Sequence, residues 1–346
     1  MSDRVSLLDL SRKELADVLQ SWGEPPYRAD QIWRALYARA ATGSEALTEL
    51  PRALRRRLDE AFGFRGLEVR AEARSLDGHT TKVLLGRPGE ARAFEAVRME
   101  YIRRTTLCIS TQAGCAMGCS FCATGQMGFG RNLKAGEIVE QVLHFAEHSQ
   151  VTNIVFMGMG EPFHNYEATL EAVDRLNDPQ GMGFGARRMT ISTVGLVPQI
   201  ERFTEENRQV NLAVSLHAAT DSLRNQLLPV NRKYPLDVLL AACRSYVEHT
   251  RRRISFEWAL IQGVNDGLDQ AAALADRLHG LMCHVNLIPL NPTHGYSGLA
   301  SPRARAAAFQ AHLQTRGIAC TLRVRRGLDI EAGCGQLAAR APNGNL

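Results

Sequence analysis

Apolar residues near the start of the chain recur every three or four positions, a spacing that places them on one face of an α-helix. Leu54, Leu58 and Phe62 form one such set. A polar cap such as Ser11, or a proline such as Pro51, commonly marks the first turn of a helix. The pattern therefore predicts a small helical domain over residues 1–65, with helices over 13–22, 27–39 and 51–62.

Between residues 66 and 104 the pattern changes to short runs in which apolar and polar residues alternate. Alternation of this kind is typical of β-strands with one buried face. Turn-forming pairs, Asp77-Gly78 and Pro88-Gly89, separate the runs. We expect a short antiparallel β extension that links the helical domain to the core, with strands over 81–85, 93–97 and 99–102.

From residue 105 to residue 346, short apolar runs alternate with helical stretches. Strands separated by helices favour parallel pairing with right-handed crossovers, so the expected fold class is α/β, an incomplete or complete barrel of six strand–helix units. Active sites of such barrels lie at the carboxyl ends of the strands. The predicted strands are 107–111, 153–157, 189–193, 211–216, 254–261 and 285–290, with a further run at 319–324; the predicted helices include 135–148, 167–176, 235–248 and 268–278.

The composition is that of an ordinary globular protein, with 45% hydrophobic and 22% charged residues, and this excludes a disordered chain. No apolar run approaches the ~18 residues that span a bilayer, and the first ten residues lack the pattern of a signal peptide. We expect a cytoplasmic protein that does not enter the membrane. The net charge of +5, from 41 basic and 36 acidic residues, is compatible with a nucleic-acid partner but does not by itself indicate one.

The eight cysteines are too few and too unevenly spread for a disulfide scaffold. Cys115, Cys119 and Cys122 form a C-x3-C-x2-C triplet just after the first predicted barrel strand. Three thiolates in one tight loop can bind three irons of a 4Fe-4S cluster and leave the fourth iron open. A structural zinc site takes four ligands, so three cysteines with no nearby histidine favour a cluster over zinc, unless a distant residue completes a zinc site. Three further cysteines are expected only to pack in the core: Cys243, Cys283 and Cys320.

The triplet, with Phe121 before its last cysteine, resembles the signature of the radical S-adenosylmethionine (radical-SAM) enzymes. This resemblance implies a radical-SAM partial (β/α)6 barrel over residues 105–346. It also implies a 4Fe-4S cluster bound by Cys115, Cys119 and Cys122, whose open iron binds S-adenosylmethionine and reduces it to a deoxyadenosyl radical. The matching residues at the strand ends, expected to bind S-adenosylmethionine, are Gly160, Glu161, Ser192, Ser215, Leu216, His217 and Asn291.

Residues 115–133 and 326–337 together are similar to the RlmN/Cfr family of RNA adenosine methyltransferases, and the similarity covers nearly the whole chain. The form Gly160-Glu161-Pro162 resembles the RlmN branch. This branch methylates carbon-2 of an adenosine in 23S rRNA near the peptidyl-transferase centre, and also tRNA beside the anticodon. The Cfr branch methylates carbon-8 instead and confers antibiotic resistance, and it is the alternative here.

Carbon-2 of adenine is electron-poor and does not attack the methyl group of S-adenosylmethionine directly, so a radical route is required. The family resemblance implies that Cys334 carries the methyl group, that Glu95 accepts the carbon-2 proton, and that Cys108 forms a disulfide with Cys334 to release the product. Two S-adenosylmethionine molecules are used in each turnover. Without the resemblance, Glu95 would be interpreted as the solvent-facing residue of an alternating strand.

The substrate adenine must be unstacked to reach such a site. A basic run on the third helix is a candidate surface for the RNA backbone, although such runs are more often solvated helix faces. We also expect an electron donor such as flavodoxin or ferredoxin, and a monomer. A non-catalytic, zinc-stabilised RNA-binding protein is the alternative from another class, and it would lack the visible absorption of an iron–sulfur cluster. The basic run comprises Arg52, Arg55, Arg56 and Arg57.

Overall fold

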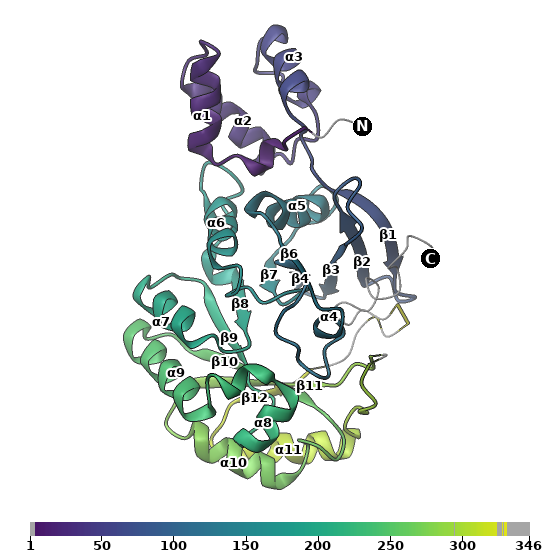
Figure 1. The fold of residues 1–346 in the computed structure, drawn as a ribbon, viewed down its shortest axis with the longest axis vertical. Helices are drawn as coiled ribbons and strands as arrows, with labels where there is room; N and C mark the ends of the chain where they lie inside the picture. Colours follow the sequence, from purple (N-terminus) through teal and green to yellow (C-terminus); the bar gives the residue numbers. More distant parts are fainter. Residues whose placement is uncertain (1–3, 294, 324–326, 328, 331–346) are drawn as a thin grey trace.

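A computed structural model describes residues 4–293, 295–323, 327 and 329–330. A helical module at one end of the molecule stands on a core built around a ten-stranded sheet (Figure 1). The module comprises α1 (Arg12–Ser21), α2 (Tyr27–Ala38) and α3 (Arg52–Ala61), with short 3-10 helices at Leu7–Asp9 and Ser44–Ala46. The three predicted helices are confirmed.

Ser11 caps α1 as predicted. Its hydroxyl accepts a hydrogen bond from the Glu14 backbone N–H at 3.2 Å, and the Glu14 carboxylate accepts one from the Ser11 N–H at 2.7 Å. This reciprocal pair satisfies two N–H groups that the first turn of a helix otherwise leaves without partners. The start of α1 is therefore determined by local sequence.

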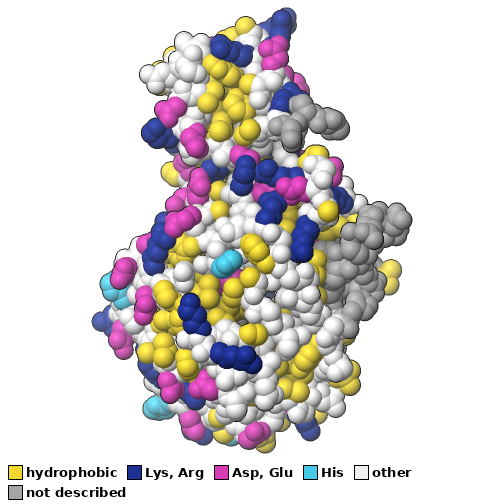
Figure 2. Space-filling model, viewed as in Figure 1, with side chains coloured by type: hydrophobic (Ala, Val, Ile, Leu, Met, Phe, Trp, Pro, Cys, Tyr) yellow, Lys and Arg dark blue, Asp and Glu magenta, His cyan; other side chains and the backbone are white. Residues whose placement is uncertain are grey.

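Ion pairs join the module to the core. Arg87 contacts Asp9 of the module at 3.1 Å and Glu137 of the core at 2.8 Å, and Lys134 also contacts Asp9 at 2.8 Å. Arg131 contacts the same Glu137 at 2.7 Å. Dark blue and magenta side chains gather at this junction in Figure 2. Buried apolar residues of the module also belong to one continuous hydrophobic cluster with the sheet. Both ion pairs and apolar packing therefore hold the module on the core.

The β extension and the barrel share one sheet. Strands β1 (Glu68–Arg74), β2 (Thr80–Gly86), β3 (Phe94–Tyr101) and β4 (Arg104–Cys108) pair antiparallel in sequence order, and β4 then pairs in parallel with β7 (Asn153–Phe156). The two expected strands over 93–97 and 99–102 are one strand, β3. The expected strand over 107–111 ends at Cys108, because the chain then turns into a separate hairpin.

Parallel pairing continues from β4 to the last strand in the order β4-β7-β8-β9-β10-β11-β12, which confirms the α/β partial barrel. The later strands are β8 (Met189–Thr193), β9 (Asn211–Ser215), β10 (Ile254–Leu260), β11 (Cys283–Pro289) and β12 (Cys320–Leu322). The helices are α5 (Ala135–Ala146), α6 (Tyr166–Asn177), α7 (Val197–Glu205), α8 (Asp221–Leu227), α9 (Leu236–Thr250), α10 (Leu268–Leu278) and α11 (Arg303–Thr315), with 3-10 turns at Ala186–Arg188 and Pro229–Arg232.

A two-stranded hairpin, β5 (Gln112–Gly114) with β6 (Phe129–Asn132), follows β4 and was not predicted. Between its strands lie the cysteine triplet and the short helix α4 (Ala123–Gln126). None of the described helices is long and apolar enough to cross a membrane. The hairpin places the cysteine loop at the carboxyl end of the first barrel strand, where the fold builds its sites.

Candidate active site

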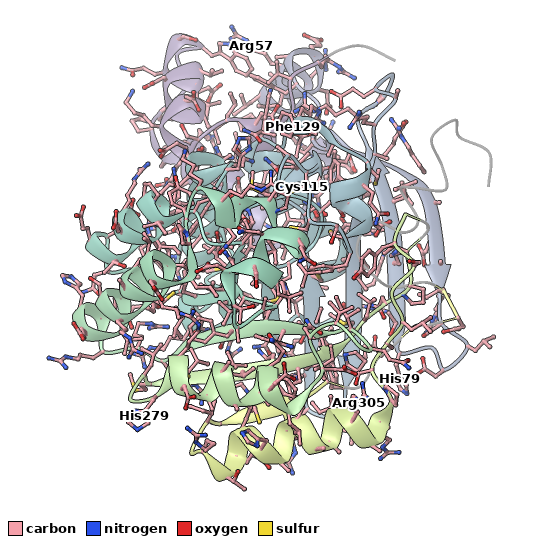
Figure 3. All side chains as sticks on the ribbon, turned by 60° about the horizontal axis from the view of Figure 1, so that its bottom comes forward. Arg57, His79, Cys115, Phe129, His279 and Arg305 are labelled. Carbon is pink, nitrogen blue, oxygen red and sulfur yellow. The ribbon has the colours of Figure 1, made fainter. Side chains whose placement is uncertain are left out.

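The cysteine loop is closed at its base by the β5–β6 hairpin. Gly114 lies opposite Phe129 in the hairpin, and the Cys115 N–H donates to the Gly128 carbonyl at 3.0 Å. Gly114 has a φ of +87°, and a side chain there would collide with that same carbonyl, so glycine is required. Cys115 and Phe129 are labelled near each other in Figure 3. The two ends of the loop are thus held together, which keeps the three cysteines in one small region.

The loop and the carboxyl ends of the barrel strands enclose a cavity of about 230 Å³. Most of the residues predicted from sequence meet there, although they come from separate strands. The cavity lining includes Cys115, Cys119, Cys122, Gly160, Glu161, Ser192, Ser215 and His217. Two expected cofactor residues are not part of it: Leu216 is fully buried and Asn291 follows β11 outside the lining. Cys334 lies outside the described residues.

The three thiols fit an iron–sulfur cluster. Burial raises the pKa of Cys115 to about 12, and burial together with the charges of Cys122 and Cys115 raises the pKa of Cys119 well above its usual value. Thiolates in such a place need a cationic group to bind. In the described part of the chain, no three His, Cys, Asp or Glu side chains are grouped to hold a single metal ion. In an iron–sulfur cluster each thiolate binds a different iron, so the three sulfurs need not converge on one point.

Glu161 is a buried carboxylate with its geometry fixed by backbone groups. Its two oxygens accept hydrogen bonds from the N–H groups of Phe163 at 3.0 Å and Val194 at 2.8 Å. Burial raises the pKa of Glu161 to about 7, against the effect of these hydrogen bonds. A carboxylate held on the cavity wall is suited to bind an ammonium group, such as the amino group of S-adenosylmethionine.

Gly160 has a φ of +102° and lies against Gln112, whose Cβ would be 2.5 Å from an added side chain. We predict that Gly160→Ala weakens S-adenosylmethionine binding about tenfold or more, because strain of about 1–3 kcal/mol must be relieved by moving the cavity wall. The matched control is Gly89→Ala, since Gly89 also has a positive φ, +78°, but nothing lies within 4 Å of its added Cβ. Equilibrium dialysis on the cluster-loaded protein measures the affinity. Equal affinities for the two variants would contradict the prediction.

His217 is held in one neutral tautomer. Burial lowers its pKa to about 3, so the ring is uncharged at neutral pH. Its Nδ1 accepts a hydrogen bond from the Ala259 N–H at 2.8 Å, which leaves the proton on Nε2. The ring of Phe121, from the cysteine loop, meets His217 edge-on at 4.9 Å. His217 therefore offers a hydrogen-bond donor to the cavity and also supports the loop.

A fully buried arginine on α8 holds the end of β9 in place. Arg224 donates to the carbonyls of Leu216 at 3.1 Å, Ser215 at 3.1 Å and Val194 at 2.7 Å, and to the Asn231 side chain at 2.9 Å. Burial lowers its pKa to about 10, against the opposing effects of Cys119, Cys243 and Asp221. Sequence inspection missed this residue, which looks like an ordinary polar position of a helix.

We predict that Arg224→Met destabilises the protein by about 3–5 kcal/mol, because three strand-end carbonyls lose their donor in a buried place. Arg232→Met is the control, since Arg232 is exposed, and its effect should stay within about 0.5 kcal/mol. Thermal unfolding of both variants by calorimetry gives the comparison. If Arg224→Met melted at the temperature of the unmodified protein, the role given to Arg224 would be wrong.

Glu257 lines the cavity and was also missed by the sequence prediction. It is buried on β10, and its carboxylate accepts a hydrogen bond from Asn286 on β11 at 2.8 Å. Burial raises its pKa. An acidic residue within the mostly apolar run of residues 254–260 was the available signal. Other lining residues that were missed are Thr124, Phe156, Met157, Gly158, Thr193, Val194 and Ile288.

Glu95 and Cys108 meet outside the cavity lining, together with Lys82. Glu95 is only 2% exposed, so the alternative of a solvent-facing strand residue is wrong. Its carboxylate lies 2.9 Å from the Lys82 ammonium. Burial raises the pKa of the Cys108 thiol to about 12, while a hydrogen bond from the Met157 backbone and the Lys82 charge lower it and the Glu95 charge raises it. Because Met157 lines the cavity, this second cluster of residues adjoins it.

The basic run on α3 is mostly exposed. Arg52, Arg56 and Arg57 reach the surface, and the Arg57 guanidinium also lies over the Trp22 ring at 4.4 Å, whereas Arg55 is half-buried. The three packing cysteines are buried in the hydrophobic core, as predicted: Cys243, Cys283 and Cys320. An RNA-binding role for α3 stays a prediction.

Two family profiles match the chain. The profile of the Radical SAM superfamily matches residues 109–275, which hold the cysteine loop and most of the cavity. The profile described as the ribosomal RNA large subunit methyltransferase N-terminal domain matches residues 5–63, the helical module. The two parts of the chain that the structure distinguishes thus each resemble a known domain.

Individual relatives cover nearly the whole chain. The dual-specificity RNA methyltransferase RlmN 1 of Myxococcus xanthus is 50% identical over 339 residues, covering 96% of this chain and 94% of that protein. The probable dual-specificity RNA methyltransferase RlmN of Chloroflexus aurantiacus is 49% identical over 350 residues, covering 96% and 93%. The crystal structure of a radical SAM methyltransferase from Sphaerobacter thermophilus matches with a TM-score of 0.93 and 49% identity, covering 96% of this chain and 98% of that one.

Identity near one half over such lengths confirms the resemblance found in the sequence and sets aside the alternative of a non-catalytic zinc protein. The cofactors of the superfamily, a 4Fe-4S cluster and S-adenosylmethionine, agree with the cysteine loop and the cavity beside it. The chain belongs to the RlmN family of radical SAM RNA methyltransferases.

Proposed function

We propose that the protein methylates carbon-2 of an adenosine in 23S rRNA near the peptidyl-transferase centre, and of an adenosine beside the anticodon in tRNA. The observation that carries this proposal is the second cluster, Glu95 with Cys108, adjoining the cavity through Met157. Cleavage of S-adenosylmethionine alone needs neither a base nor an extra thiol. A base beside a thiol is what transfer through a protein sulfur requires.

When bound, the cluster and S-adenosylmethionine supply a one-electron reduction that yields a carbon radical able to remove hydrogen from a methyl group. Cys115, Cys119 and Cys122 are proposed to hold the cluster. Gly160 and Glu161 are proposed to bind the methionine part of S-adenosylmethionine, with Ser192, Ser215 and His217 contributing further contacts. Leu216 and Asn291 lie outside the cavity lining, and a role for them stays a prediction. An electron donor of the flavodoxin or ferredoxin class is proposed to supply the electron, and the protein is proposed to act as a monomer.

The proposed route passes through the sulfur of Cys334. Its thiolate takes a methyl group from one S-adenosylmethionine, which leaves as S-adenosylhomocysteine. One hydrogen of that methyl group is then removed at the expense of a second S-adenosylmethionine, and the resulting carbon radical adds to carbon-2 of the adenine. The RNA is now joined to the protein through a sulfur–carbon bond.

Glu95 and Cys108 are proposed to release the product. Glu95 accepts the proton from carbon-2. The Cys108 thiolate attacks the Cys334 sulfur, the sulfur–carbon bond breaks, and a Cys108–Cys334 disulfide forms. The departing carbon takes up one proton to become the methyl group, and the electron used to start the radical chemistry is released. External thiols then reduce the disulfide for the next turnover.

The RNA must present an unpaired adenine, because a base inside a duplex cannot reach an enclosed site. The exposed arginines of α3 are proposed to contact the backbone near this adenine. The words "dual-specificity" in the names of the relatives agree with two kinds of RNA substrate. The module that carries α3 matches the domain named for ribosomal RNA methyltransferases.

Nucleoside mass spectrometry tests this proposal. Ribosomal RNA and tRNA are isolated separately from cells with and without the gene, digested, and examined for methylated adenosines. Loss of 2-methyladenosine from both RNA fractions on deletion is the expected result, with its return when the gene is restored. Loss of 8-methyladenosine instead would assign the Cfr-type activity. Loss of 2-methyladenosine from only one RNA fraction would show that the unchanged RNA is not a substrate.

A further inference from the structure

A lysine is completely buried in the β extension. Lys82 is on β2, a strand with every residue buried, and it is opposite Ala73 on β1 and Val97 on β3. Its ammonium lies 2.9 Å from the Glu95 carboxylate on β3. Lysine is almost never fully buried unless it is paired, because removing an ammonium from water is costly.

The strand register places Lys82, Glu95 and Cys108 on one face of the sheet. Lys82 is opposite Val97 across β2 and β3, and Val97 is opposite Cys108 across β3 and β4. Directly opposite residues point to the same face, as do residues two apart on one strand, so Glu95 shares the face of Val97. The Lys82 charge accordingly acts on the Cys108 thiol and lowers its pKa, while the Glu95 charge raises it.

A buried ion pair is a poor way to stabilise a sheet, since apolar residues of similar size often serve equally well. The pair therefore calls for a functional explanation. Its position beside Cys108, at the edge of the cavity, supplies one.

We propose that Lys82 is a positioning residue that serves Glu95 and Cys108 in turn, an inference that rests on the proposed function. Before proton transfer the ammonium is paired with the Glu95 carboxylate. Once Glu95 has accepted the carbon-2 proton and become neutral, the same ammonium faces Cys108 and stabilises its thiolate. The proton that Cys108 loses is matched by the one that the departing carbon takes up, and Glu95 later returns its proton to solvent. The net charge of the three groups is thus zero before proton transfer and again when the thiolate attacks.

The test uses the full-length, cluster-loaded protein with a substrate RNA and S-adenosylmethionine in single-turnover reactions. Lys82→Gln removes the charge but keeps a donor for Glu95, and Lys82→Arg keeps the charge. For Lys82→Gln we expect methylated RNA to form about 100-fold more slowly while a covalent protein–RNA adduct accumulates. Methylation of Cys334 and formation of deoxyadenosine should change less than about twofold, since they precede the step that Lys82 assists. Lys82→Arg should restore product formation and clear the adduct.

Several outcomes would overturn the role of Lys82. One is release of product by Lys82→Gln at the normal rate. Another is a Lys82→Gln variant in which Cys334 methylation, deoxyadenosine formation and product release all fall together and no adduct forms, as expected for a merely structural role. Adduct accumulation in Lys82→Arg would also overturn this role. If Lys82→Gln does not fold, the comparison of Lys82→Arg with the unmodified protein provides the test. Lys13→Met, at an exposed lysine of α1, is the control. A parallel Cys108→Ala reaction distinguishes failure of the proposed function from failure of the role of Lys82. If neither Lys82→Gln nor Cys108→Ala forms an adduct, the proposed function is wrong. If Cys108→Ala forms the adduct and Lys82→Gln does not, only the role of Lys82 is wrong.

Discussion

A Cys108→Ala variant is expected to stop with its RNA substrate covalently attached. The radical addition does not involve Cys108, so the sulfur–carbon bond to RNA should form as usual. Without the second thiol, no disulfide can form and the bond cannot be broken by exchange. Product release should fall by about a thousandfold or more, as expected for loss of an essential nucleophile. Denaturing gel electrophoresis and mass spectrometry of the RNase-treated protein detect a mass increase on Cys334.

Cys320→Ala is the matched control, because Cys320 is a buried cysteine in the hydrophobic core, far along the chain from the cysteine loop. It loses a thiol of the same kind at a place with no proposed chemistry. It should turn over normally and accumulate no adduct. If Cys108→Ala released methylated RNA as fast as this control, Cys108 would not be the resolving thiol.

A Cys334→Ala variant is expected to abolish RNA methylation altogether. Cys334 is the proposed carrier, and without its sulfur there is no methyl group from which hydrogen can be removed. The three cysteines of the loop are untouched, so the visible absorption of the cluster and its reduction should persist. The measurement is transfer of a labelled methyl group from S-adenosylmethionine to RNA and, separately, to protein, and both should be absent.

Cys283→Ala, at another buried core cysteine, controls for general effects of losing a thiol and should retain both transfers. Methylated RNA from Cys334→Ala at the rate of this control would show that the methyl group does not pass through Cys334. Labelled protein without labelled RNA would locate the carrier at another residue.

The fold could be predicted where local pattern decides it. Helix α1 begins at its Ser11 cap, and strand β8 has the bounds expected from its apolar run. Strand β1 was not predicted, because it is an edge strand with charged, exposed positions in place of an apolar run. Charged residues on an edge strand discourage pairing with other chains. Strand β3 was divided at Arg98 in the prediction, yet its pairing with both β2 and β4 continues through that residue.

The candidate site could be predicted only in part, for a physical reason. The residues whose side chains or glycine conformations are chemically distinctive, such as the cysteine triplet and Gly160, were recognised from the sequence and meet at one cavity. Lys82, Glu257 and Arg224 were missed. Charged residues on strands and helices normally face water, and only a partner from another strand explains their burial, as Glu95 does for Lys82.

The helical module illustrates the same distinction for RNA binding. A basic run on α3 was visible in the sequence, but Arg57 also stacks on Trp22 and Arg55 is half-buried. Composition and residue spacing do not show that an arginine lies over an aromatic ring or is partly buried. The exposed Arg52 and Arg56 are therefore the first positions of α3 to vary in RNA-binding experiments.

In the proposed route the methyl carbon reaches adenine carbon-2 through a protein sulfur. Isotope labelling tests it most directly: S-adenosylmethionine with a trideuterated methyl group is supplied to the purified, reduced enzyme with substrate RNA. We expect 2-methyladenosine in which two deuterium atoms remain and one hydrogen has been taken from solvent, with the missing deuterium in deoxyadenosine. A product that kept all three deuterium atoms, or one methylated at carbon-8, would contradict it.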